Sequence, residues 1–137
     1  MQPEGIVHVL RQLCSAVVAG GQVVDLQAIE PSGRVEVDGR PVGRIDDRIF
    51  FRRARRAVAG LDTLVDEGLL TRGPETAFDT LVRYDTGAEL AAAIADSDER
   101  RMPRALARIL ADAGPCVVRE RSYVRLLRRV DSEGERA

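Results

Sequence analysis

Apolar side chains recur at helical spacing in several stretches of the chain, and this pattern predicts four helices. In residues 4–19 and 46–67 they fall at i, i+3, i+4 and i+7, which places them on one face of a helix. Thr86, followed three residues later by Glu89, has the pattern of a capping box, so a third helix is expected to begin there. Pro103 suits the first turn of a fourth helix.

Three further stretches have the composition or the alternation of β-strands. Residues 22–29 begin with β-branched side chains and carry little charge, which is typical of a strand covered on both faces. Residues 75–85 alternate between polar and apolar positions. The face that they share holds Phe78, Thr80, Val82 and Tyr84. Residues 116–128 are apolar at both ends and on both faces, so they are predicted to form an internal or near-internal strand. The charged centre of this strand, residues 119–121, is expected at the mouth or at an edge of the sheet.

A β-hairpin is predicted over residues 34–45. Asp38 and Gly39 favour the left-handed backbone angles of a two-residue turn. Pro41 cannot donate a ladder hydrogen bond, so the second strand of the hairpin should be short and lie at an edge. The segment Glu30-Pro31-Ser32-Gly33 is expected to end the strand before it.

The elements follow in the order α-β-hairpin-α-β-α-α-β, which predicts an α/β fold with a small mixed sheet and flanking helices. A chain of 137 residues is long enough for one domain with its own core. We assign residues 1–130 to a single domain and the polar residues 131–137 to a disordered tail.

The composition excludes a strong overall electrostatic field around the protein. The net charge is −1, and all 21 basic residues are arginine. Arginine clusters are therefore weaker evidence of phosphate binding than in a chain that also uses lysine, because arginine supplies every positive charge here. The densest cluster lies at the start of the helix predicted over 46–67. It comprises Arg52, Arg53, Arg55 and Arg56, a possible nucleic-acid patch or the solvated face of an amphipathic helix.

Residues that carry catalysis or bind metals are sparse. His8 faces away from the apolar stripe of its helix, and Cys14 and Cys116 lack the spacing of a metal site. No stretch has the pattern of a nucleotide loop or of a serine or zinc hydrolase. We assign no catalytic, cofactor-binding or metal-binding residue. The longest apolar runs are too short to span a bilayer, and Glu4 does not fit a signal peptide, so the sequence predicts a soluble cytoplasmic protein.

Residues 5–129 resemble the C-terminal half of an S-adenosylmethionine-dependent methyltransferase of the Rossmann-like class, in particular its small actinobacterial members. The resemblance is carried by segments in the same order, among them "GQVVDLQAIEP", "FDTLVRYDTGAEL" and "CVVRERSYVRLLRR". It implies a sheet in which 116–128 lies between 22–29 and 75–84 and runs antiparallel to both. The glycine-rich loop and the acidic residue that hold the cofactor in this family have no counterpart here, so the resemblance implies no cofactor site in the isolated chain.

The resemblance also implies a partner. In the complete family fold the strand like 22–29 pairs with a neighbour that this chain lacks, so an apolar sheet edge is expected to be open. The expected partner-strand interface is Val23, Val24, Leu26 and Ala28. We therefore expect a non-catalytic, methyltransferase-like accessory or assembly protein. It would form a homodimer, or it would be the second component of a split methyltransferase whose partner restores S-adenosylmethionine binding.

Two other functions stay open at this point. The arginine cluster would suit a winged-helix-like DNA-binding regulator, although a β-hairpin rather than a second helix precedes the candidate recognition helix. The second open function is a small-molecule binding module that uses a vestigial acceptor cleft. Tyr84 would line this cleft, or it is simply a core residue.

Overall fold

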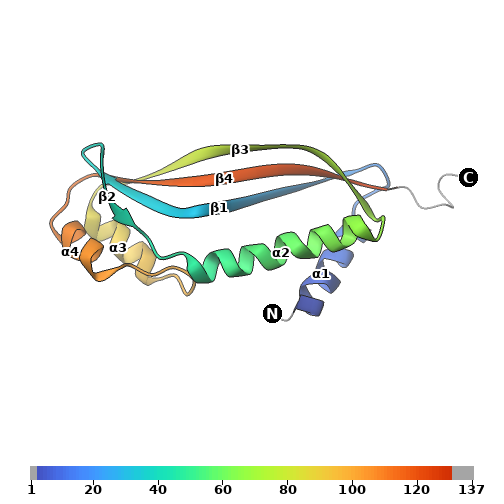
Figure 1. Ribbon diagram of the computed structural model, residues 1–137, viewed down its shortest axis with the longest axis horizontal. Helices are drawn as coiled ribbons and strands as arrows, with labels where there is room; N and C mark the ends of the chain where they lie inside the picture. The colour runs from blue at the N-terminus through green and yellow to red at the C-terminus, as the bar shows by residue number, and fades with distance from the viewer. Residues whose placement is uncertain (1–2, 131–137) are drawn as a thin grey trace, which may run out of the picture. The chain divides into compact units, whose positions relative to one another are not determined.

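The computed structural model describes residues 3–130 of the 137-residue chain, and the predicted tail lies outside the described residues. Within them the fold is mixed α/β, with four helices and an open four-stranded sheet (Figure 1). The elements are α1 (Pro3–Ser15), β1 (Gln22–Val37), β2 (Arg40–Arg44), α2 (Arg48–Asp66), β3 (Leu70–Tyr84), α3 (Gly87–Ala95), α4 (Arg104–Ala111) and β4 (Cys116–Arg129). The predicted order of helices and strands is confirmed, except that the strand predicted over 22–29 and the first strand of the hairpin form one continuous strand, β1.

The sheet has the strand order β2-β1-β4-β3 (Figure 1), which confirms the predicted place of β4 between β1 and β3. The start of β1 lies beside the end of β4, where Gly20 N–H donates to Arg129 O at 3.0 Å and Arg129 N–H donates to Gly21 O at 2.9 Å. Adjacent strands are antiparallel throughout. The prediction of a mixed sheet was therefore wrong, because no two neighbouring strands run parallel.

Two strands are longer than their sequence pattern indicated. β1 continues through Pro31 to Val37, and β3 begins at Leu70 and passes through Pro74. Proline is tolerated in a strand where no neighbouring strand needs its missing N–H. β2 pairs with β1 only over Arg34–Val37, and β3 is the last strand of the sheet. Both prolines therefore lie in segments that have one unpaired side.

The hairpin between β1 and β2 is confirmed. Asp38 and Gly39 have φ angles of 52° and 74°, the left-handed values that a tight two-residue turn requires. Pro41 lies opposite Glu36 in the short strand β2, which forms one end of the strand order. A register shift follows Val35, so the hairpin contains an irregularity of the bulge type.

The chain divides into two compact units, which we describe separately. The first contains residues up to 27, 53–76 and from 123. Its core comes from α1, α2, β3 and β4. The buried side chains are Cys14, Leu61, Leu64, Leu70 and Leu127. Gly60 lets α1 approach α2 closely, because a Cβ at this position would lie 2.7 Å from Cδ1 of Leu10.

The second unit contains residues 28–52 and 77–122. Its core joins the hairpin, α3, α4 and the start of β4. The buried side chains are Val35, Ile45, Leu90, Ile94, Leu106, Leu110, Cys116 and Val118. The predicted capping box is confirmed, because Thr86 Oγ1 accepts from Glu89 N–H at 3.1 Å while the Glu89 carboxylate accepts from Asp85 N–H at 3.2 Å. Pro103 is the N-cap of α4 rather than its first helical residue.

Candidate interaction surfaces

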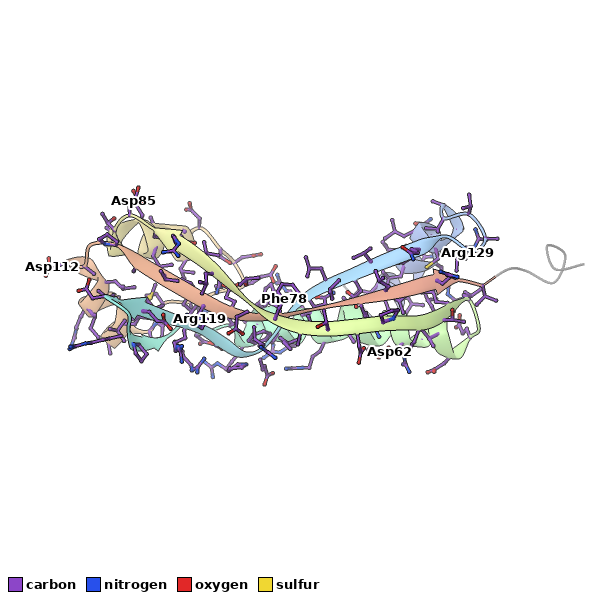
Figure 2. All side chains as sticks on the ribbon, turned by 90° about the horizontal axis from the view of Figure 1, so that it is seen from above. Asp62, Phe78, Asp85, Asp112, Arg119 and Arg129 are labelled. Atoms are coloured by element: carbon purple, nitrogen blue, oxygen red, sulfur yellow. The ribbon has the colours of Figure 1, made fainter. Side chains whose placement is uncertain are left out.

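Three of the five arginines of β4, namely Arg119, Arg121 and Arg125, bind carboxylates of the same chain. In the second unit Arg119 contacts Glu36 at 3.2 Å and Asp79 at 3.7 Å, and Arg121 contacts Asp79 at 3.1 Å. Hydrogen bonds from Arg119 and from Arg34 lower the pKa of Glu36. These side chains lie on the face of the sheet opposite the buried Val118. Figure 2 shows the sheet from above, with Arg119 labelled.

The charged centre of β4 therefore lies within a ladder of ion pairs that crosses three strands. It was predicted at the mouth or at an edge of the sheet, and that prediction was wrong because β4 has a neighbouring strand on each side. Strand residues directly opposite each other stabilise a sheet when their charges are opposite. Arg119 and Arg121 are therefore paired with carboxylates of the chain itself.

Arg125 belongs to β4 as well, but it is buried in the first unit. Its guanidinium donates to Asp25 at 2.8 Å, to Asp62 at 2.8 Å and to the carbonyl oxygen of Val58 at 3.4 Å. The Arg125 and Asp25 side chains are 6% and 3% exposed, whereas Asp62 keeps 36% of its surface. Burial alone would raise the pKa of Asp62, but hydrogen bonds from Arg125 and Arg72 outweigh it and lower that pKa.

A second ion-pair cluster, which is partly buried, lies in the second unit. Arg100 contacts Asp47 at 2.7 Å and Glu120 at 2.8 Å, and Asp47 also accepts from Gly33 N–H at 3.1 Å. Burial disfavours the charged form of Arg100, but the hydrogen bonds and charge attraction to Asp47 and Glu120 together outweigh it and raise the pKa of Arg100. Glycine is required at position 33, because a Cβ there would lie 2.9 Å from Cγ1 of Val118.

A small cavity adjoins this cluster, with a volume of about 110 Å³. Its walls include Ile29, Phe50 and Phe51 beside Asp47 and Arg100. An apolar cavity of about 150 Å³ holds a benzene molecule, so this one is too small for most metabolites. The predicted cleft residue Tyr84 does not line it. Tyr84 packs instead against the core of the second unit.

The predicted partner-strand residues of β1 have different surroundings. Val24 and Leu26 are 62% and 63% exposed, on the face opposite the buried Asp25. Val23 packs against the core of the first unit, and Ala28 is half-buried beside the cavity of the second unit. Of the four predicted residues, Val24 and Leu26 therefore present apolar surface to the solvent.

The backbone of β1 next to these side chains is unpaired on one side. β2 pairs with β1 only from Arg34 to Val37, and β4 lies on the other side. In the described part of the chain, residues 22–27 of the first unit thus have β4 as their single neighbouring strand. An edge of this kind presents alternating N–H and C=O groups that a further strand can bind.

A second exposed edge lies along β3, the strand that the predicted order placed at one end of the sheet. β3 ends the sheet on the side opposite β2, and in the second unit it exposes Phe78, Leu81 and Val82 by 36%, 45% and 42%. The alternation of residues 75–85 indicated that Phe78 and Val82 share a face, but not that both side chains are exposed. The terminal position of β3 depends on its pairing with β4, from which 31 residues separate it in the chain.

The four arginines predicted as a nucleic-acid patch, residues 52, 53, 55 and 56, are all exposed on α2. Exposure is what both the phosphate-binding hypothesis and the solvated-face hypothesis require. The hairpin that precedes α2 is confirmed, so no helix lies directly before it in the chain as the helix-turn-helix pattern requires.

Other candidate chemistry is limited within residues 3–130. His8 is exposed, as predicted, while Cys14 and Cys116 are free and buried, and burial raises the pKa of both thiols. No group of three or more metal-binding side chains comes together among these residues, and none of their helices is long and apolar enough to cross a membrane. Comparisons with protein-family models, with curated proteins and with solved structures gave no match.

Proposed function

We propose that this chain is a non-catalytic accessory protein that assembles with another polypeptide through the open edge of β1. The observation that carries the proposal is the unpaired outer edge of residues 22–27, with Val24 and Leu26 more than 60% exposed beside it. The partner is a second copy of the chain or a separate polypeptide that supplies the neighbouring strand.

The physical argument concerns both the backbone and the side chains of this edge. An exposed apolar edge strand pairs readily with other chains, and proteins usually protect such edges with charges, bulges or a covering element. Apart from Asp25, whose carboxylate is engaged by Arg125, residues 22–27 carry no charge. Covering Leu26, which is 63% exposed, would contribute about 1–2 kcal/mol per copy.

The methyltransferase-like origin is part of the proposal. Its support is the strand order β1-β4-β3 with an antiparallel centre, which is the arrangement that the sequence resemblance implies. In that family the strand corresponding to β1 has a further neighbour on the side where residues 22–27 of the described chain have none. A separate polypeptide that restores methyl transfer would have to provide both this neighbour and the S-adenosylmethionine site, so we expect the isolated chain not to bind that cofactor in titration calorimetry.

Hydrogen exchange of the amides in residues 22–27 tests the proposed edge directly. In the assembled protein we expect slow exchange of these amides, which becomes faster on dilution and in the variant Leu26→Lys. Val18→Lys is the matched control, because Val18 is 76% exposed in the same unit but lies outside the strand. Fast exchange in the undiluted wild-type protein, or equal effects of the two lysine variants, would refute the proposal.

A further inference from the structure

We propose that a second copy of this chain binds along the outer edge of β3, with residues 78–84 of the two copies paired antiparallel about a twofold axis at Leu81. This inference rests on the proposed function, in which open sheet edges are assembly surfaces. It concerns a different edge, and it names both the occupant and its register. Two four-stranded sheets would join into one sheet of eight strands.

The edge is available in the second unit. β3 has β4 on one side, and no strand of the described chain lies on its other side. Phe78, Leu81 and Val82 expose 36%, 45% and 42% of their surface, which is a dense group of apolar side chains for an edge strand. These residues lie within one strand of one unit, so the surface does not depend on how the two units are placed.

The segment Phe-Asp-Thr-Leu-Val-Arg-Tyr is self-complementary when read outward from its central leucine. In an antiparallel twofold pair, residues at equal distances from the axis lie opposite each other. Leu81 then faces Leu81 of the partner copy, and Asp79 faces Arg83 of the partner copy. Each step outward thus matches side chains of compatible chemistry. The other opposite pairs are Thr80 with Val82 and Phe78 with Tyr84, and every such pair occurs twice.

The faces of β3 agree with this register. Thr80 and Tyr84 point to the covered side, because Thr80 Oγ1 lies 3.5 Å from Ser122 Oγ and Tyr84 packs on the core. Asp79 points to the other side, where it contacts Arg121 at 3.1 Å, and its side chain is still 43% exposed. Residues that lie opposite each other in an antiparallel pair point to the same face of the sheet. In this register the covered face of β3 in one copy therefore continues into the covered face of β3 in the other copy.

Neighbouring registers lose the charge match. If the axis moves to Thr80, Asp79 lies opposite Leu81 and Arg83 lies opposite Ala77. If it moves to Val82, Arg83 lies opposite Leu81 and Asp79 lies opposite Asp85. Like charges directly opposite each other destabilise a sheet. An axis between two residues would bring the core face of one copy opposite the open face of the other. The axis at Leu81 is therefore the favoured arrangement.

A cysteine at the axis tests the register. Opposite residues of an antiparallel pair have Cα atoms about 4.5–5.5 Å apart, within the range of a disulfide. We expect Leu81→Cys to form a disulfide-linked dimer rapidly under mild oxidation. Arg83→Cys should not, because the two copies of residue 83 would be separated by four residues, about 13 Å. The native cysteines are buried and remain in both variants. Equal cross-linking of the two variants, or none, would overturn the inference.

Charge reversal at Arg83 tests the pairing without oxidation. Arg83→Glu would place a glutamate opposite Asp79 of the partner copy twice, so we expect the dimer dissociation constant to rise about 10- to 30-fold. Arg104→Glu makes the same charge change on exposed α4 of the same unit and should leave the constant unchanged. A dimer that is insensitive to Arg83→Glu would overturn the inference.

The two proposals fail separately. Protection of residues 22–27 without any effect of the Leu81 and Arg83 variants would retain the proposed function and reject the β3 dimer. Cross-linking through residue 81 with unprotected amides at 22–27 would reject assembly through β1 and retain the β3 dimer. A monomer with fast exchange at both edges would reject both.

Discussion

Replacing Arg125 with methionine should destabilise the protein more than any other single loss of an ion pair in the described chain. The Arg125 and Asp25 side chains are 6% and 3% exposed, and they join at 2.8 Å. Without the guanidinium, Asp25 retains only the amide of Gln27, at 2.7 Å, as a side-chain partner. Removing one member of a buried pair costs about 3–5 kcal/mol, because the remaining charge stays buried and uncompensated.

The other carboxylate bound by Arg125 should contribute little to this loss. Asp62 is 36% exposed and keeps its contact with Arg72 at 3.1 Å, so water and a second arginine still solvate it. Arg72→Met is therefore a matched control, because it removes an exposed arginine from the same carboxylate. Exposed ion pairs contribute about 0–1 kcal/mol, and we expect a loss in that range.

Urea denaturation followed by circular dichroism measures both variants, at one fixed protein concentration because assembly also affects stability. With a slope of about 2 kcal/mol per M, the Arg125→Met midpoint should fall by about 1.5–2.5 M. The double variant Arg125→Met with Asp25→Leu should regain much of the loss, since no unpaired buried charge remains. An Arg125→Met loss below about 1 kcal/mol, or one equal to that of Arg72→Met, would refute the reasoning.

Three further outcomes follow from the structure. Hydrogen bonds from the side chain and the backbone N–H of Arg48 lower the pKa of Asp46 from 3.8 to about 2. The stability that Asp46 adds is therefore present above pH 4 and is lost as the pH falls toward 2. The free energies of unfolding of wild type and Asp46→Asn, measured in urea, should become equal near that pH. Gly87→Ala should lower the free energy of unfolding, measured by thermal unfolding, by at least about 1–3 kcal/mol, because the added Cβ would lie 2.1 Å from Leu110 O. Gly114→Ala should leave the free energy of unfolding nearly unchanged, because a Cβ at position 114 would have no atom within 4 Å. Both cysteine thiols should resist a thiol reagent until the protein is unfolded, because they are buried with raised pKa values; rapid labelling of the native protein would contradict their placement.

Local signals predicted most of the elements. The turn at Asp38-Gly39 and the cap at Thr86 depend on residues within a few positions, and both are confirmed. The predicted length of β1 was wrong because the segment with Pro31 was taken to end the strand, and that of β3 was wrong because only the alternating residues 75–85 were assigned to it. Whether Pro31 breaks a strand depends on which neighbour pairs with it, and that neighbour is fixed by tertiary structure.

The interaction surfaces depend on contacts between distant residues. Arg125 and Asp25 are 100 positions apart, and Arg119 and Glu36 are 83 apart. The carboxylates that engage Arg119, Arg121 and Arg125 are scattered along the chain, so no local pattern could show that these three arginines are paired. The self-complementary pattern around Leu81 is visible in the sequence, but it gains meaning only because β3 is the terminal strand.

The absolute mass of the purified wild-type protein, measured by light scattering over a range of concentrations, tests the central claim in its self-assembling form, that the open sheet edges bind a second copy of the chain. A single chain has a mass of 15.0 kDa. We predict a species of at least twice that mass which dissociates on dilution. A constant mass of 15.0 kDa at every concentration would contradict the account.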